Sequence, residues 1–447
     1  MNQFPKNFVF GAATAAYQIE GASDLSLRGP SIWDTFTHRG GTIKDGTTGD
    51  SACDHYHRYR EDVHHMAGIG LGGYRFSLSW PRILPDGTGF SNQAGIDFYD
   101  RLIDLLLEQG IVPYVTLYHW DLPQALQDKG GWANRDTARY FADYAAKAFT
   151  LYGDRIRHWV TFNEPWVATT YGCIEGIHAP GIQDLSYAFQ SAHNMLLGHA
   201  MAVSAYRDSP SPQGEIGIVL NLHPCHSASE SEKDQLAATY HDGFLNRWFL
   251  DPVFKGEYPE DMMRLYEEKG CMPEVLEGDL SLLKDNPVDF LGINYYFRFI
   301  VQHDDAAPLG FSEVKPTGDQ VTICGWRPYP EGLLEILERV HHSYRVPKIL
   351  ITENGIAHQE QPHVHGQIED DYRIDYIAAH LEVCLRAIAK GILVSGYFIW
   401  SLLDNFEWAD GYIPRYGLIH TDHTTFIRSW KKSAYWYRDV IERRGLS

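Results

Sequence analysis

Short apolar runs recur along the chain and alternate with amphipathic stretches. Each run is rich in β-branched or aromatic residues, is bounded by Gly, Pro, Asn or His, and is short enough to form a strand buried on both faces of a parallel sheet. The eight runs are Val9–Phe10, Gly73–Ser79, Val112–Leu117, Trp159–Phe162, Ile216–Asn221, Phe290–Asn294, Ile349–Thr352 and Gly396–Trp400.

The stretches between these runs have helical periodicity. In Ile96–Gln109, apolar residues fall on one face of a helix, and Gly110 follows as a stop signal. Thr137–Leu151 and Arg373–Ala389 have the same pattern. Strand and helix alternating eight times predict an α/β fold, a (β/α)8 barrel that forms a single domain over residues 1–447. The remaining residues predict long insertions in the loops after the strands, chiefly Arg28–Tyr56, His303–Pro330 and Ala357–Asp371.

Composition narrows the class of protein. With 44% apolar residues the chain can bury a large core, and a formal charge of −20 without a basic run argues against a nucleic-acid partner. The six cysteines are scattered, no apolar run approaches the roughly 20 residues that span a membrane, and the N-terminus lacks the pattern of a secretory signal. We therefore expect a soluble cytoplasmic protein that does not enter membranes, and homo-oligomer formation is left open.

Polar residues collect where the predicted strands end. In a (β/α)8 barrel these ends meet at one mouth, where such enzymes place their chemistry. Two glutamates, Glu164 after Thr161-Phe162-Asn163 and Glu353 after Ile351-Thr352, directly follow apolar runs. Hydrolysis of a glycosidic bond requires two carboxyl groups on either side of that bond. A single glutamate at a strand end is more often an ion-paired rim residue, but a pair that faces one mouth favours catalysis.

Several sequence blocks resemble glycoside hydrolase family 1, the β-glucosidases and their relatives. The two blocks around the glutamates, Thr161–Trp166 (TFNEPW) and Ile351–Gly355 (ITENG), are similar to the two signatures of that family. The resemblance runs from end to end, and its other blocks are Phe8–Gly21, Tyr74–Arg82, His178–Gly181, Gly325–Trp326 and Trp400–Trp408.

The resemblance implies a role for each candidate catalytic residue. It implies that Glu353 is the nucleophile and Glu164 the general acid/base of a retaining β-glycosidase, with the two carboxyl groups about 5–5.5 Å apart. Arg75 could keep Glu353 ionised by charge pairing, and Tyr296 could donate a hydrogen bond to the same carboxylate. Burial and the charge of Glu353 would both raise the pKa of Glu164, so that it starts protonated.

The resemblance also implies a sugar-binding pocket. Amide, imidazole and carboxylate groups can bind several vicinal hydroxyls, while indoles cover the apolar faces of a pyranose. Trp326 resembles the aromatic platform on the leaving-group side, and Tyr416 departs from the phenylalanine most common in the family, which places a hydroxyl near the nucleophile. The substrate-binding candidates are Gln18, His119, Trp120, Asn163, Asn294, Trp326, Trp400, Glu407, Trp408 and Tyr416.

The predicted substrates are small β-glycosides such as cellobiose and aryl or alkyl β-glucosides, with β-galactosides and β-fucosides alongside. A carboxylate at Glu407 would repel a 6-phosphate, which argues against phosphorylated sugars. Ser429–Ser433, with its serines and two lysines, superficially suggests a phosphate site, but we interpret it as the solvated start of a helix.

Two other functions compete with this one. Close histidine pairs such as His55/His57 and His223/His226 suggest a metal-dependent barrel hydrolase, but the spacings typical of zinc sites are missing, and no cofactor or metal is expected. A sugar-binding barrel without activity would be free to lose either glutamate, whereas both are present. Excess chelator and a nitrophenyl β-glucoside assay separate these alternatives from a glycosidase.

Overall fold

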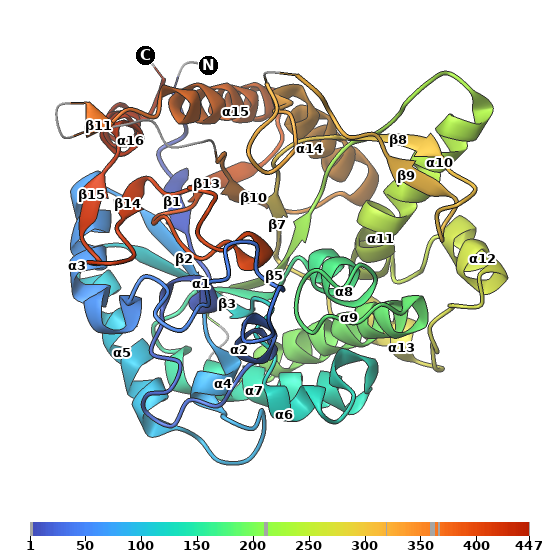
Figure 1. Ribbon diagram of the computed structural model, residues 1–447, viewed down its shortest axis with the longest axis horizontal. Coiled ribbons are helices and arrows are strands. Elements are labelled where there is room, and N and C mark those ends of the chain that lie inside the picture. The colour runs from blue at the N-terminus through green and yellow to red at the C-terminus, as the bar shows by residue number, and fades with distance from the viewer. Residues whose placement is uncertain (1–2, 210–212, 319, 358–362, 365–366, 447) are drawn as a thin grey trace.

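The computed structural model describes residues 3–209, 213–318, 320–357, 363–364 and 367–446. Its centre is a closed barrel of eight parallel strands, which confirms the predicted (β/α)8 architecture (Figure 1). Around the barrel the strands follow the order β1-β13-β10-β7-β5-β4-β3-β2. They are β1 (Val9–Ala13), β2 (Gly73–Ser77), β3 (Val112–Tyr118), β4 (His158–Asn163), β5 (Glu215–Asn221), β7 (Phe290–Asn294), β10 (Ile349–Asn354) and β13 (Val394–Trp400).

Long helices surround the barrel and bury their apolar faces against it. In α5 the buried residues include Ile96, Leu102 and Leu106, as the periodicity predicts. The helix begins at Gln93, earlier than the predicted start at Ile96, because its polar first turn does not contribute to the apolar pattern. The helices of the outer layer include α3 (His55–Ile69), α5 (Gln93–Glu108), α7 (Asp136–Tyr152), α9 (Leu185–Arg207), α11 (Trp248–Lys255), α14 (Pro330–Tyr344), α15 (Asp371–Ala389) and α16 (Lys432–Arg443).

Shorter elements occupy the connections. The short helices include α1 (Ala16–Ile19), α2 (Ile32–Thr37), α4 (Trp80–Ile83), α6 (Gln124–Gln127), α8 (Pro165–Cys173), α10 (Glu232–Asp242), α12 (Glu260–Glu268) and α13 (Asp279–Asp285). A three-stranded sheet contains β6 (Cys225–Ser227), β8 (Phe299–His303) and β9 (Phe311–Glu313), and β14 (Ile419–Thr421) pairs with β15 (Arg428–Trp430). The predicted insertion Ala357–Asp371 lies partly outside the described residues. In its described part, β11 (His363–Val364) pairs with β12 (Gln367–Ile368).

The barrel closes between its first and last strands. β1 pairs in parallel with β13, with Ala13 opposite Trp400, and with β2 on its other side. Gly11 permits this close approach, because a Cβ atom there would lie 2.4 Å from the ring of Phe398. The chain termini lie next to each other (Figure 1), and the amide of Phe4 donates to the carbonyl of Arg444 at 2.8 Å.

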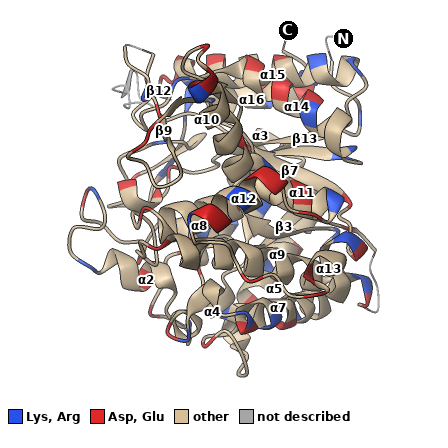
Figure 2. Cartoon of the chain, turned by 90° about the vertical axis from the view of Figure 1, so that its right-hand side faces the viewer, with Lys and Arg blue, Asp and Glu red and all other residues tan. Residues whose placement is uncertain are grey.

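The outer surface carries charges of both signs. On the face with α11, α12 and α13, acidic and basic residues are interspersed rather than gathered into a basic stripe (Figure 2). Among the helices of the described residues, none is long and apolar enough to cross a bilayer.

Candidate active site

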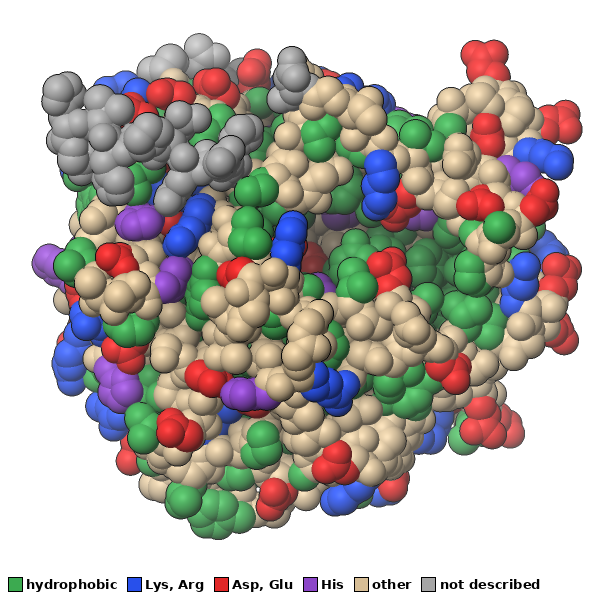
Figure 3. Space-filling model, in the orientation of Figure 1, with side chains coloured by type: hydrophobic (Ala, Val, Ile, Leu, Met, Phe, Trp, Pro, Cys, Tyr) green, Lys and Arg blue, Asp and Glu red, His purple; other side chains and the backbone are tan. Residues whose placement is uncertain are grey.

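A cavity of about 600 Å³ opens at the carboxyl ends of the barrel strands. One face of the molecule is hollowed, and hydrophobic side chains gather in the hollow (Figure 3). The predicted site residues that line the cavity are His119, Trp120, Glu164, Tyr296, Trp326, Glu353, Trp400, Glu407, Trp408 and Tyr416. The other four, Gln18, Arg75, Asn163 and Asn294, are almost fully buried and hydrogen-bond to cavity residues or to their neighbours.

Glu353 lies in β10 and is held by two neighbours. Arg75 Nη1 lies 2.7 Å from its Oε1, and the hydroxyl of Tyr296 donates to its Oε2 at 2.8 Å. Arg75 and Glu353 are 1% and 4% exposed, so the ion pair is shielded from water. Such a pair fixes both the orientation and the charge of the carboxylate.

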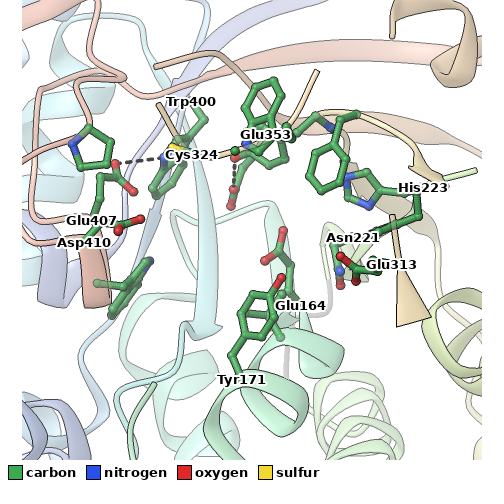
Figure 4. A pocket seen from close by; sticks show the side chains of 18 of the residues that line it. Glu164, Tyr171, Asn221, His223, Glu313, Cys324, Glu353, Trp400, Glu407 and Asp410 are labelled. Atoms are coloured by element: carbon green, nitrogen blue, oxygen red, sulfur yellow. Dashed lines mark hydrogen bonds between the residues drawn. The ribbon is translucent and has the colours of Figure 1, made fainter. Parts of the chain in front are cut away.

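Glu164 stands at the junction of β4 and α8, and its surroundings are different. Its backbone adopts a left-handed conformation with φ of 45°, which is uncommon for a residue with a side chain and typical of functional sites. The Asn294 amide donates to Glu164 Oε1 at 2.7 Å, and the described residues bring no cation into contact with the carboxyl group. The carboxyl groups of Glu164 and Glu353 point toward each other across the cavity (Figure 4).

These environments separate the acid strengths of the pair. Burial, and then the nearby charge of Glu353, raise the pKa of Glu164 to about 8. Burial also raises the pKa of Glu353 above its ordinary value, but Arg75 and Tyr296 oppose that rise. The first proton to leave the pair is therefore the one on Glu353, and the remaining proton stays on Glu164 near neutral pH.

A hydrogen-bond network behind the pair fixes one imidazole. Asn163 Oδ1 accepts from Arg75 at 2.7 Å, so the amide nitrogen of Asn163 must be the group that donates to His119 Nε2 at 3.0 Å. Burial lowers the pKa of His119 well below its ordinary value, so the ring is neutral and its proton lies on Nδ1. Among the described residues, neither His119 Nδ1 nor Gln18 Oε1 has a hydrogen-bond partner, so each keeps hydrogen-bonding capacity for a polar ligand.

One end of the cavity is walled by aromatic rings and a carboxyl group. Glu407 accepts from the indole of Trp400 at 3.3 Å and from Gln18 Nε2 at 3.3 Å. Burial raises the pKa of Glu407 well above its ordinary value. Trp120 and Trp408 pack with ring centroids 4.6 Å apart, and both have positive φ values. Sugar-binding candidates that follow three strands, β1, β3 and β13, thus meet at this end.

The opposite end of the cavity contains residues that the sequence did not single out. Phe297 stacks on Trp326 with ring centroids 5.5 Å apart, and Asn221 and Glu313 also line the wall. Asn221 is the last residue of β5, so reading that strand end as well would have found it. Glu313 comes from β9, outside the barrel, and no sequence pattern pointed to it.

Tyr416 lies at the predicted place but has a partner that the sequence did not suggest. Its hydroxyl lies 3.1 Å from Cys324 Sγ, and its ring lies 6.3 Å from that of Tyr296. Tyr416 therefore links the last loop of the barrel to the loop that carries Trp326. His178 also lines the cavity, whereas the buried Cys173 does not.

The interpretation of Ser429–Ser433 as a helix start is confirmed, but the stretch is not solvated throughout, because Lys431 and Ser433 are buried. The helix α16 does begin there, at Lys432, but Lys431 is buried and its Nζ lies 2.7 Å from Asp404 Oδ1. Asp404 is fully buried in the loop after β13, and a buried carboxylate requires a cationic partner. The stretch is a structural ion-pair site.

No metal centre emerges from the part of the chain that the structure describes. Among those residues, no group of three or more His, Cys, Asp or Glu side chains is arranged to hold a metal ion. The pair His55/His57, for example, is divided between Asp62 and Asp54.

An eight-stranded barrel whose mouth holds two facing carboxyl groups, an arginine and a wall of indoles defines a hydrolase of the carbohydrate-active (β/α)8 class. The chain belongs to glycosyl hydrolase family 1, since the family model of that description matches residues 1–446. The resemblance inferred from the sequence blocks is thereby confirmed.

Relatives in this family match the chain over its whole length. It is 48% identical over 445 residues to Beta-glucosidase A of Acetivibrio thermocellus, covering 99% of each chain. It is 46% identical to Beta-glucosidase A of Thermotoga maritima, over 100% of this chain and 99% of the relative. A solved structure, the family 1 β-glucosidase from Thermotoga maritima, superposes with a TM-score of 0.96 over 100% of this chain and 99% of that chain. A structure of the Thermotoga maritima β-glucosidase in complex with glucoimidazole also has a TM-score of 0.96.

Proposed function

We propose that this protein is a retaining exo-β-glycosidase that removes terminal β-D-glucosyl residues from small glycosides such as cellobiose and aryl or alkyl β-glucosides. Family membership and the names of its relatives support the activity. The observation that carries the proposal is the asymmetry of the carboxyl pair: Glu353 is held by Arg75 and Tyr296, whereas Glu164 has a raised pKa.

The reaction follows from that asymmetry in two displacements. Glu353 attacks the anomeric carbon while Glu164 gives its proton to the glycosidic oxygen, so the aglycone leaves as a neutral alcohol and a glycosyl ester remains on Glu353. Forming the ester consumes the charge of Glu353, and the pKa of Glu164 then falls. Glu164 next takes a proton from water, whose oxygen displaces Glu353 and restores the original anomeric configuration.

The sugar sits, in this proposal, between the carboxyl pair and the end walled by Trp400 and Trp408. Gln18, His119 and Glu407 bind its hydroxyls, and Asn163 binds the 2-hydroxyl, a contact that strengthens toward the transition state. β-Galactosides and β-fucosides differ from glucosides at C4 or C6, and such differences are often worth only about 1–3 kcal/mol. We therefore expect activity on all three.

The decisive experiment replaces each glutamate in turn and adds azide. We expect Glu353→Ala to abolish hydrolysis of 4-nitrophenyl β-glucoside, and azide to restore turnover of an activated glucoside with an α-glucosyl azide as product. Glu164→Ala should instead yield a β-glucosyl azide, because the nucleophile remains. Glu331→Ala, which removes an exposed carboxylate paired with Arg386, is the matched control and should keep wild-type rates.

Three results would reject the proposal. Full activity of Glu353→Ala would remove that residue from its role, and loss of activity in excess chelator would favour metal-dependent hydrolysis instead. Failure of the wild type to cleave any β-glycoside in a chromogenic panel would leave only sugar binding.

Location and assembly remain predictions. Each of the six cysteines is free in the structure, which supports a reducing compartment such as the cytoplasm. Cell fractionation tests the location, and light scattering tests whether the chain forms a homo-oligomer.

A further inference from the structure

The cavity has a second polar end, on the leaving-group side. Its wall there includes residues of the three-stranded sheet β6-β8-β9, which lies outside the barrel. Glu313, the last residue of β9, lines the cavity close to Asn221 and His223, and Glu164 lies between this group and Glu407 (Figure 4). An acidic side chain thus faces the space that an aglycone would occupy.

The carboxylate of Glu313 has two neighbours, the imidazole of His241 and the ammonium of Lys315. His241 Nε2 lies 3.6 Å from Oε1, and Lys315 Nζ lies 3.2 Å from Oε2. His241 is 2% exposed, and its other nitrogen, Nδ1, lies 3.1 Å from Cys225 Sγ. His241 thus lies between the cysteine and the Glu313 carboxylate and limits how far that carboxylate can turn away from the cavity.

Glu313 keeps its negative charge although its side chain is partly buried. Burial opposes its ionisation, but His241 and then Lys315 outweigh burial and hold the pKa of Glu313 below its ordinary value. Burial first, and Glu313 among the neighbouring charges, raise the pKa of Tyr171, which also lines the cavity. The charge of Glu313 therefore acts on at least one other side chain that lines the cavity.

The other charged residues of this rim are either screened by water or held by other groups. Lys315 has 80% of its side chain in solvent, so water screens its charge. The guanidinium of Arg298 stacks 4.0 Å over the ring of Tyr329 and contacts His226, and Arg327 donates to the carbonyl of Thr317. Of these four residues, Glu313 is the one whose charged group is both held in place by neighbours and partly shielded from water.

We propose that Glu313 determines which leaving groups this enzyme prefers, favouring aglycones that carry an ammonium or other hydrogen-bond donor over aglycones that carry a carboxylate. The inference rests on the proposed glycosidase activity and concerns the leaving group alone. The Glu313 carboxylate attracts a cationic group on the aglycone. It repels an anionic group, which also loses hydration when it enters the cavity. The two kinds of substrate should therefore differ in kcat/KM.

The test uses three β-glucosides of similar shape, with 4-(aminomethyl)phenyl, 4-(carboxymethyl)phenyl and 4-methylphenyl leaving groups. The measured quantity is the ratio of kcat/KM for the cationic substrate to that for the anionic one, compared between wild type and Glu313→Gln. The comparison cancels intrinsic differences in leaving ability. We expect the ratio to fall about tenfold in Glu313→Gln, since one charge at contact range is removed. Lys315→Met should raise the ratio.

Controls separate this inference from the proposed function and from misfolding. Glu335→Gln removes a carboxylate that is paired with His226 outside the cavity, and its ratio should equal that of the wild type. Thermal unfolding verifies that each variant is folded. If the wild type cleaves the neutral glucoside but Glu313→Gln leaves the ratio unchanged, this inference fails and the activity stands. If the wild type cleaves none of the three, the proposed function itself fails.

Discussion

At the scale of single residues, the two carboxyl groups differ in what surrounds them rather than in chemical type. Glu353 accepts hydrogen bonds from Arg75 and Tyr296, whereas Glu164 accepts one from the neutral amide of Asn294. A cation stabilises a carboxylate, while burial without a cation favours the protonated form. These neighbours are the physical reason for the roles that we propose, Glu353 as nucleophile and Glu164 as acid.

This asymmetry predicts the shape of the pH profile. Because Glu164 must be protonated in the free enzyme and its pKa is about 8, kcat/KM for an alkyl β-glucoside should fall as the pH rises through about 8. Toward acid pH, kcat/KM should fall as Glu353 becomes protonated and ceases to be a nucleophile. In Glu164→Ala, assayed with a dinitrophenyl glucoside that needs no acid, the alkaline fall should vanish. An unchanged alkaline limb in that variant would assign the pKa to another group.

Tyr296→Phe tests the support of the nucleophile. The change removes the 2.8 Å hydrogen bond to Glu353 Oε2 and leaves the ring in place. A hydrogen bond to a charged group is worth about 1.5–3 kcal/mol, so kcat/KM should fall by about 10- to 150-fold. Steady-state kinetics on 4-nitrophenyl β-glucoside measures the loss. Tyr435→Phe, at an exposed tyrosine on α16, is the control, and an equal loss there would exclude a specific role for Tyr296.

At the scale of elements, the loop after β13 depends on an ion pair from a distant part of the chain. Asp404 accepts from Lys431 Nζ and from the amide of Gly417, and the next residue, Asn405, accepts from Gln18. The loop that carries Glu407 is thereby anchored to α1, which contains Gln18, and to the start of α16. Lys431, one of the two lysines in the Ser429–Ser433 stretch, therefore has a structural role in holding this loop.

Breaking that pair should cost much more than breaking a surface pair. Asp404→Asn removes the carboxylate that pairs with the buried ammonium of Lys431, and removing one member of a buried pair costs about 3–5 kcal/mol. Glu331→Gln, at an exposed pair with Arg386, should cost about 0–1 kcal/mol. Urea unfolding monitored by tryptophan fluorescence gives both values. Comparable losses for the two variants would contradict the structural role of the Asp404–Lys431 pair.

The elements also show which parts of the molecule the sequence could predict. All eight strands lie at the predicted runs, because a strand buried on both faces leaves a continuous apolar signal. Glu164 and Glu353 could be located because strand ends in a barrel converge on one mouth. Glu313 and Lys431 could not, because the first comes from a small sheet in an inserted loop and the second acquires its role only through contact with Asp404. Neither feature produces a hydrophobic periodicity or a motif that can be recognised in the sequence.

At the scale of the whole molecule, closure of the barrel joins the two ends of the chain. β1 is hydrogen-bonded between β13 and β2, and the ring of Tyr437 on α16 packs edge-on against Phe10. Loss of either end would open the sheet and expose unpaired strand edges. The proposed catalytic residues come from strands spread around the ring, so their geometry depends on a closed barrel.

This arrangement predicts that the protein unfolds as one cooperative unit over residues 1–447. Differential scanning calorimetry should give one transition whose calorimetric and van't Hoff enthalpies agree. A glycosidase inhibitor that binds only the folded state, added at 100 times its Kd, should stabilise that state by about 2.7 kcal/mol and shift the entire transition upward. The same shift should be absent with a sugar that the enzyme does not bind. Two transitions, of which the inhibitor moves only one, would show instead that part of the chain folds independently of the barrel that holds Glu164 and Glu353.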